Sequence, residues 1–144
     1  MTAACTRQNA CARATPSAAP AGGKLKPAMS VLHTPLSILH TESSTGWGGQ
    51  EIRILTEARA MLDRGHRVLL LTPAGAEILP AAQRTGVPVE AIDIERKRLG
   101  PLLAMRRWLA RHGHEFDVIN THSSTDSWLV AIASAMLPDA PPLV

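Results

Sequence analysis

Residues 36–72, LSILHTESSTGWGGQEIRILTEARAMLDRGHRVLLLT, decide the fold. A short apolar run, a glycine-rich loop, an amphipathic segment and a second apolar run follow one another, which is the order of a βαβ unit. Residues 36–40 and 67–72 are predicted as strands, and the unbroken apolar run of the second is typical of a parallel sheet covered on both faces. Residues 50–64 are predicted as a helix that ends at Gly65. The apolar residues spaced along one face of this helix are Ile52, Leu55, Ala58 and Leu62.

The alternation of strands and helices continues to the end of the chain. The further predicted strands are residues 87–94 and 117–121, and the further helices are residues 76–85, 101–112 and 123–136. The residues of the second of these helices that are predicted to face inward are Leu102, Met105 and Leu109. Pro88 indicates an edge position for the third strand, and residues 142–144 are predicted to begin a fifth.

This order of elements predicts an α/β fold, a doubly wound, Rossmann-like parallel sheet with the strand order 3-2-1-4-5. A sheet of this kind normally completes its fifth strand. Because the sequence stops where that strand begins, we expect the domain to be incomplete after the start of strand 5 and the chain to be truncated.

Charge divides the chain into two parts. Residues 1–35 carry four basic residues and no acidic one, whereas residues 36–144 carry the other 11 basic residues and all 12 acidic ones. We interpret residues 1–35 as a basic, disordered leader or as a mis-assigned start before Met29, and an organellar transit peptide stays open. Residues 36–144 form the predicted domain, and its mixed charge gives no indication of a nucleic-acid partner.

Cysteine content and hydropathy limit the cellular location that we expect for this protein. Both cysteines, Cys5 and Cys11, fall in the leader, and neither they nor the histidines have the spacing of a metal site, so no metal is expected. A domain without cysteine needs no oxidising compartment, which favours a cytoplasmic protein. No stretch approaches the roughly 20 apolar residues of a membrane span.

Two unusual segments follow strands 1 and 4, which flank the point where such sheets bind ligands. The first is TESSTGWGGQE, residues 41–51. Its glycines, Gly46, Gly48 and Gly49, allow a tight turn and close approach of a ligand, and the start of the following helix suits a phosphate. The alternative is that any turn between a strand and a helix favours glycine. Trp47 is predicted to be exposed, and Glu42 either faces the cleft or is a solvated loop acid.

The second segment is NTHSSTDSW, residues 120–128. His122 ends strand 4 among polar neighbours, which favours a functional role over a structural one. Ser123, Ser124 and Asp126 are candidate ligand contacts, but the S-x-x-D pattern of Ser123 and Asp126 equally predicts a helix cap. Trp128 is interpreted as packing. The basic run of residues 96–98 is interpreted as a solvated loop, with contact to an anionic acceptor as the alternative.

Nucleotide cofactors of two common kinds are disfavoured by the spacing. A G-x-G-x-x-G pattern begun at Gly46 puts Glu51 at the third glycine, and Thr72 and Pro73 stand where an acidic residue is expected. No Gly-Lys-Ser/Thr of a phosphate-binding P-loop occurs. An NAD-dependent oxidoreductase domain therefore remains only as a weaker alternative, beside a non-catalytic α/β module that binds a phosphate-containing ligand.

Three segments resemble one known family. GWGGQE, residues 46–51, is similar to the G-G-x-E loop of retaining GT-B glycosyltransferases, whose N-terminal domain is called glycosyltransferase 4-like. E-x-R-x-L-x-E-A-R-x-x-x-x-R-G-H-x-V, residues 51–68, resembles the first helix and second strand of that domain. Residues 120–128 resemble its segment with a cleft histidine. The resemblance covers residues 36–144.

The resemblance implies one half of a two-domain enzyme. The N-terminal domain of such enzymes mainly shapes the acceptor site, and a C-terminal domain, absent here with its paired glutamates, binds the nucleotide-sugar. Gly48 and Gly49 would lie against the donor diphosphate and His122 near the transferred sugar. The resemblance further implies a nucleotide-sugar as co-substrate with no cofactor and no metal, and a glycan or lipid-linked acceptor. It also implies a role in lipopolysaccharide or surface glycan synthesis and peripheral association with the inner membrane. We expect the chain alone to be inactive.

Overall fold

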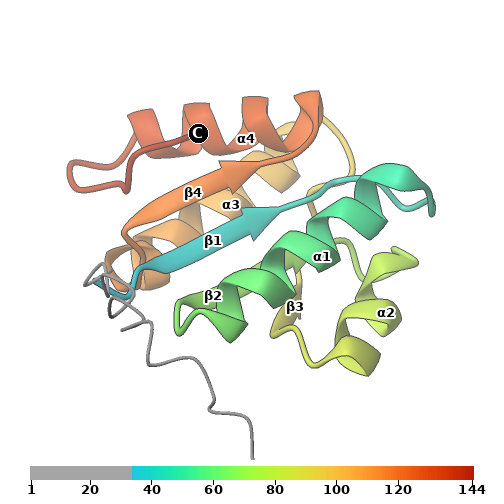
Figure 1. Cartoon of the computed structure of the whole chain (residues 1–144). Coiled ribbons are helices and arrows are strands. Elements are labelled where there is room, and N and C mark those ends of the chain that lie inside the picture. The colour runs from blue at the N-terminus through green and yellow to red at the C-terminus, as the bar shows by residue number, and fades with distance from the viewer. Residues whose placement is uncertain (1–33) are drawn as a thin grey trace, which may run out of the picture. The chain divides into compact units, whose positions relative to one another are not determined.

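A computed structural model describes residues 34–144. Its sheet has parallel strands in the order β3-β2-β1-β4 (Figure 1). The strands are β1 (Ser37–Thr41), β2 (Arg67–Thr72), β3 (Val89–Ala91) and β4 (Val118–Thr121). Leu143 adds an isolated parallel bridge to Ile119, where a fifth strand is predicted to begin. The predicted doubly wound parallel sheet is therefore confirmed, whereas most of the predicted leader, residues 1–33, lies outside the described residues.

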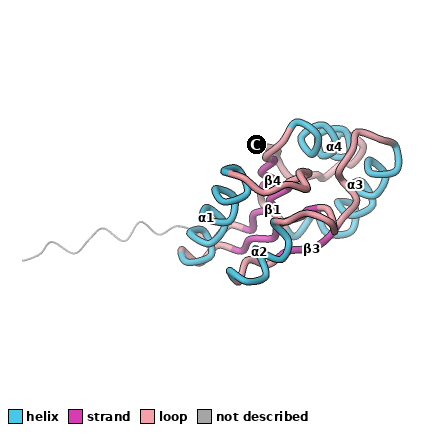
Figure 2. Tube along the Cα trace, turned by 90° about the vertical axis from the view of Figure 1, so that its right-hand side faces the viewer, coloured by secondary structure: helices cyan, strands magenta, loops and turns pink. Residues whose placement is uncertain are grey.

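Helices cover both faces of the sheet. They are α1 (Gly49–Asp63), α2 (Ile78–Thr85), α3 (Leu99–His112) and α4 (Ser124–Ala135), with a short 3-10 turn η1 (Gly113–Glu115) before β4. The first two lie on one face and the last two on the other (Figure 2). Alternation along β1 sends Ile38 toward α1 and α2 and its neighbour Leu39 toward α3 and α4. Full burial of each such side chain contributes about 1.5–3 kcal/mol, which is why the strands are apolar at consecutive positions.

The buried face of α1 differs from the predicted one. Ile52 is 52% exposed, and Ile54, which is not among the predicted inward residues, is fully buried. The inward residues are Glu51, Ile54, Leu55 and Ala58. They stand at helical positions i, i+3, i+4 and i+7, so the stripe is turned by part of a helical turn from the predicted one.

The segment from β3 into α3 also differs from the prediction. β3 has three residues rather than eight, because the chain leaves the sheet edge after it and Ile94 turns inward to the core beneath α3 and α4. On α3, Met105 and Leu109 are buried as predicted, and Leu102 packs partly buried against them. Trp108 is buried as well, and its indole N–H donates to Glu90 at 2.9 Å.

The register of β1 and β4 brings the two unusual segments together. Thr41 pairs with Thr121, so the two strands end level with each other. The backbone N–H of His122 then donates to the carbonyl of Thr41 at 3.2 Å. The loops that follow β1 and β4 therefore leave the sheet side by side, as the predicted switch point requires.

The turn from α1 into β2 depends on Gly65, which has a φ of 87°. Gly75 offers a matched control, since a Cβ at either glycine would meet no atom within 4 Å and only Gly65 has a positive φ. We expect Gly65→Ala to lower the free energy of unfolding by about 1–2 kcal/mol, because an L-residue is strained there. Gly75→Ala should change it by less than about 0.5 kcal/mol. Urea denaturation measures both, and equal losses would contradict the expectation.

Candidate functional site

The carboxyl ends of β1 and β4 open into a polar depression of about 470 Å³. The residues that line it are Ser43, Ser44, Thr45, Gly46, Glu95, Arg96, Ser123, Ser124 and Thr125. Most carry hydroxyl groups, each of which can donate and accept a hydrogen bond. The structure thus brings Gly46, Ser123 and Ser124 together as predicted, and adds Arg96 from the loop before α3. Such a lining suits a ligand rich in oxygen atoms.

Glu42 lies beneath the loop after β1, and its side chain is fully buried. One carboxylate oxygen accepts the N–H of Ser44 at 2.8 Å, and the other accepts the side-chain amide of Gln50. Burial raises the pKa of Glu42 above its usual range, and these two hydrogen bonds oppose that shift. Glu42 therefore neither faces the cleft nor lies solvated, the two placements that the sequence suggested. It ties both ends of the loop of residues 43–49, the glycine loop, to the sheet.

The glycine loop leads into an uncapped helix. Gly48 is the N-cap residue of α1, and no side chain accepts a hydrogen bond from the first turn. The N–H groups at such a terminus carry a partial positive charge and need an acceptor. Gly48 and Gly49 line none of the cavities described for residues 34–144, and Gly46 alone of the three faces the depression.

The fold itself does not require glycine in this loop. None of the three loop glycines has a positive φ, since Gly65 and Gly86 are the described glycines that do. A Cβ at Gly49 would meet no atom within 4 Å, and one at Gly48 would meet a Glu51 oxygen at an ordinary 3.5 Å. The backbone geometry therefore does not support the alternative that these glycines are there only because the turn favours them.

Asp126 is fully buried and joins the two segments. Its carboxylate accepts the hydroxyl of Thr41 at 2.7 Å, the N–H of His122 at 3.0 Å and the N–H of Ser123 at 3.0 Å. Ser123 and Asp126 form a capping box at the start of α4, which confirms the capping interpretation. The Ser123 hydroxyl also lies 2.6 Å from that of Ser43, so the two segments touch directly.

His122 is half-buried and forms a pair with His40 of β1, which is fully buried. The Nε2 atom of His122 lies 2.8 Å from Nδ1 of His40. The ring planes differ by 12° and the ring centroids are 5.1 Å apart. Two parallel rings with these separations must meet edge to edge, which puts the hydrogen bond close to the plane of both rings. His122 adjoins the depression through Ser123 but does not itself line it.

Both imidazoles of the pair stay neutral near pH 7. Burial lowers the pKa of His40 to about 4, and His122 beside it adds to the shift. Burial also lowers the pKa of His122, with Arg53 adding to the effect and Asp126 and Glu57 opposing it. His40 is not among the site residues predicted from the sequence. The sequence signal that could have indicated it is a histidine directly after the apolar residues of a buried strand.

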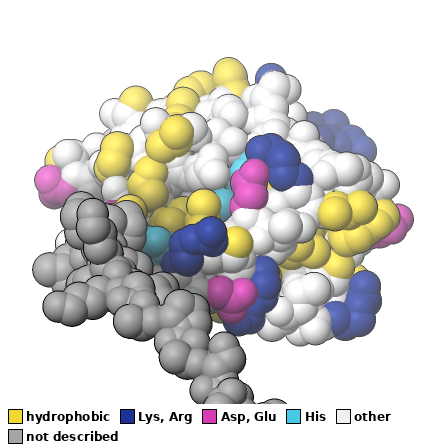
Figure 3. All heavy atoms as spheres, viewed as in Figure 1, with side chains coloured by type: hydrophobic (Ala, Val, Ile, Leu, Met, Phe, Trp, Pro, Cys, Tyr) yellow, Lys and Arg dark blue, Asp and Glu magenta, His cyan; other side chains and the backbone are white. Residues whose placement is uncertain are grey.

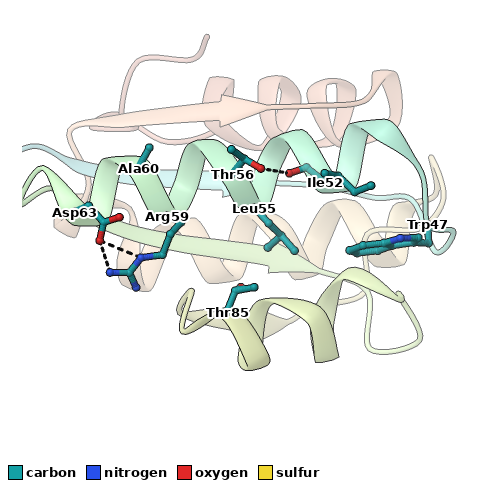
Figure 4. A pocket seen from close by; sticks show the side chains of 8 residues that line it. All are labelled: Trp47, Ile52, Leu55, Thr56, Arg59, Ala60, Asp63 and Thr85. Carbon is teal, nitrogen blue, oxygen red and sulfur yellow. Dashed lines mark hydrogen bonds and ion pairs between the residues drawn. The ribbon is translucent and has the colours of Figure 1, made fainter.

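A second, apolar groove of about 630 Å³ lies between α1 and α2 (Figure 4). Trp47 and Ile52 stand at one end of it, and they are 46% and 52% exposed. Arg59 and Asp63 form an ion pair at the other end. The exposure expected for Trp47 is thus observed. Trp128, interpreted as packing, is 40% exposed on α4, which corrects that interpretation.

The surface shows no gathering of one charge on the face seen in Figure 3, where basic and acidic side chains are interspersed. Of the basic run 96–98, Arg96 lines the depression and the other two residues are exposed. Residues 34–144 contain no group of three or more His, Cys, Asp or Glu side chains placed to hold a metal ion. None of the helices in this part of the chain combines the length and apolar character needed to cross a membrane.

Comparison with known proteins identifies a matching family and several solved structures with a similar fold. A family model described as Glycosyltransferase Family 4 matches residues 47–144. Among solved structures, Anabaena HepE in complex with UDP-glucose is 25% identical with a TM-score of 0.59, over 75% of this chain and 28% of HepE. No curated protein sequence matches the chain.

Two further structures show likeness of fold alone. A glycosyltransferase from Rickettsia africae is 15% identical with a TM-score of 0.62, over 77% of this chain and 29% of that protein. Acinetobacter baumannii MurG is 16% identical with a TM-score of 0.59, over 76% of this chain and 34% of MurG. The chain therefore spans about a third or less of the length of these proteins.

The His40 environment predicts an acid-sensitive fold. The unfolded chain binds a proton at His40 near pH 6.5, whereas the folded chain binds it only near pH 4. Between these values the unfolded state holds more protons, so stability falls as the pH falls, by up to about 3 kcal/mol from this residue. Urea unfolding across this range should show a shallower loss for His40→Asn than for the wild type. The exposed His114→Asn serves as control and should keep the wild-type slope, and parallel curves for His40→Asn and the wild type would refute the assignment.

The bonds to Asp126 predict a large loss on its removal. Asp126→Ala leaves the Thr41 hydroxyl and the N–H groups of His122 and Ser123 without their acceptor. We expect the free energy of unfolding to fall by about 2–4 kcal/mol, measured by urea denaturation at pH 7. Asp139→Ala, at an exposed position after α4, should change it by less than about 0.5 kcal/mol. A loss below about 1 kcal/mol for Asp126→Ala would mean that the segments are held together by other contacts.

Proposed function

The chain belongs to glycosyltransferase family 4, and on that premise we propose that residues 36–144 are the N-terminal, acceptor-side domain of a glycosyltransferase with the GT-B fold. The enzyme moves a sugar from a nucleotide-sugar to an acceptor hydroxyl with retention of the anomeric configuration. The observation that carries this proposal is that residues 46–49, which lead into the uncapped N-terminus of α1, adjoin the hydroxyl-lined depression at the ends of β1 and β4 through Gly46. Because the chain spans less than a third of HepE, the activity of the whole protein is part of the proposal.

The donor is proposed to be a nucleoside diphosphate sugar. HepE, which is 25% identical to this chain, is in complex with UDP-glucose. In this chain, the N–H groups at Gly48 and Gly49 would face the donor diphosphate, where a helix N-terminus stabilises negative charge. Glycine at these positions leaves space for the phosphates, and a Cβ would reduce that space. We propose that these groups and nearby cations stabilise the leaving diphosphate without a metal ion or other cofactor.

The transferred sugar and the acceptor are proposed to occupy the hydroxyl-lined side. Ser123 and Ser124 present hydroxyl groups that can bind sugar oxygens. His122 lies near the transferred sugar and orients it and the leaving group, and we assign it no role as general base. The buried Asp126 acts by holding these residues in place, and Glu42 by holding the glycine loop. The apolar groove adjoins this site in the chain, because Trp47 of the groove directly follows Gly46 of the depression.

The biological setting is proposed from the family resemblance. The acceptor is a glycan or a lipid-linked glycan, and the product contributes to lipopolysaccharide or another surface glycan. The enzyme works in the cytoplasm, associated peripherally with the inner face of the membrane. A non-catalytic module that binds a phosphate-containing ligand would use the same loop and remains the alternative. The family match offers no support for an oxidoreductase that uses NAD.

Ligand binding to the glycine loop tests the proposal on this chain. We expect millimolar UDP-glucose to shift the amide NMR signals of the glycine loop and of Ser123. Gly49→Ala should weaken binding roughly tenfold, which corresponds to about 1.4 kcal/mol, because a methyl group would stand between the α1 terminus and the diphosphate. Its stability should not fall, since alanine is the better helix former. Gly75→Ala, an equal change outside the site, should leave binding unchanged.

Three outcomes would count against the assignment. UDP-glucose shifts confined to other surfaces would remove the donor site from the glycine loop. Inorganic pyrophosphate binding as tightly as UDP-glucose would favour the non-catalytic phosphate-binding module. NAD binding at micromolar concentration would favour the oxidoreductase interpretation instead.

A further inference from the structure

His40 is a buried polar group that the proposed reaction does not yet use. It stands within β1, its side chain is fully buried, and it lines no part of the depression. Its Nδ1 atom contacts Nε2 of His122 at 2.8 Å. Its Nε2 atom is buried and has no hydrogen-bond partner among residues 34–144. A buried ring with one satisfied and one unsatisfied nitrogen restricts where the protons of the pair can be.

We propose that His40 is a positioning residue that fixes the proton of His122. The Nδ1–H group of His40 donates to Nε2 of His122, so that His122 carries its own proton on Nδ1. The role in catalysis rests on the proposed function, in which His122 lies near the transferred sugar. The proton arrangement itself is a property of this chain alone.

The direction of the hydrogen bond follows from the cost of each alternative. A neutral imidazole has one N–H donor and one acceptor nitrogen. If His122 donated to His40, the proton of His40 would sit on its buried Nε2 as an N–H without a partner. If His40 donates, the unpartnered atom is a lone pair. Buried N–H groups without a partner are rarer in proteins than unsatisfied acceptors, which favours donation by His40.

A charged pair is disfavoured by the surroundings. The groups that face His122 are His40 of β1, Arg53 and Glu57 of α1, and Asp126 of α4. The carboxylate of Asp126 is already occupied by the Thr41 hydroxyl and by backbone N–H groups, and Glu57 is paired with Arg53 at 3.2 Å. No free carboxylate among these groups is left to stabilise an imidazolium, so both rings stay neutral.

The arrangement defines what His122 can do chemically. Its Nε2 lone pair is occupied by His40, and its Nδ1 carries a proton and has no hydrogen-bond partner among the described residues. His122 therefore has no free lone pair with which to accept a proton. It can only donate a hydrogen bond to an oxygen atom of a ligand, such as a sugar hydroxyl or a phosphate. This excludes His122 as a general base and fits a role in orienting the sugar.

Nitrogen-15 NMR of the histidine side chains in the full 144-residue chain tests the proposal near pH 7.5. We expect His122 to show a protonated Nδ1 and an unprotonated Nε2, and His40 to show the same pattern. In His40→Ala the acceptor Nε2 loses its donor, so His122 should shift toward the Nε2–H form. In His40→Asn the amide nitrogen stands two bonds from Cβ, as Nδ1 does, so the Nδ1–H form of His122 should persist.

These variants separate positioning from packing. Both shorten the side chain and both are expected to lower stability, but only His40→Ala should change the proton position on His122. A wild-type His122 in the Nε2–H form, or an equal proton pattern in both variants, would overturn the proposal. If His40→Ala does not fold, the wild-type and His40→Asn spectra still decide. UDP-glucose shifts confined to surfaces away from residues 43–51, with the Nδ1–H form intact, would instead contradict the proposed donor site.

Discussion

The buried carboxylate of Asp126 is the interaction on which the arrangement of the site depends. A carboxylate removed from water is tolerated only when its oxygens accept strong hydrogen bonds. Its donors come from Thr41 at the end of β1 and from His122 and Ser123 just before α4, so the two segments must lie together for the charge to be satisfied. The level ends of β1 and β4 make this geometrically easy. Sheet register and charge burial therefore select the same arrangement of the loops.

The helices α1 and α4 begin beside the same depression but are completed differently. α4 has its first N–H groups satisfied by the capping box of Ser123 and Asp126. α1 has no side-chain cap, and the nearby Glu42 is directed to Ser44 and Gln50 instead. The carboxylate of Asp126 thus caps α4, whereas that of Glu42 holds a loop that leaves the N-terminus of α1 uncapped. An open terminus is the one available to an anionic ligand.

Local patterns predicted most of the fold, and contacts between distant residues were beyond them. The strand β2 and the helix stop at Gly65 follow from an apolar run and from a left-handed backbone position, which are local properties. The phase of α1 could not be predicted, because Ile52 and Ile54 are equally apolar and only packing distinguishes them. The pairing of His40 with His122 joins residues 82 apart in sequence. Likewise, the burial of Glu42 depends on a loop whose path no periodicity describes.

The chemistry of the depression is consistent with a ligand whose recognisable atoms are oxygens. Its lining includes serine and threonine residues and Arg96, and Glu95 is the one carboxylate residue among them. The other two carboxylates nearby, Glu42 and Asp126, are buried beneath and occupied by protein donors. With these two carboxylates occupied, the depression presents one carboxylate beside one cation and several hydroxyl groups, which favours sugar hydroxyls and phosphates over metal cations as ligands. A neutral His122 that donates from Nδ1 extends the same preference, because an imidazolium or a free base at this position would bring either a full charge or a competing acceptor. The depression, the open terminus of α1 and the histidine pair thus select for the same class of ligand, although they arise from separate elements of the fold.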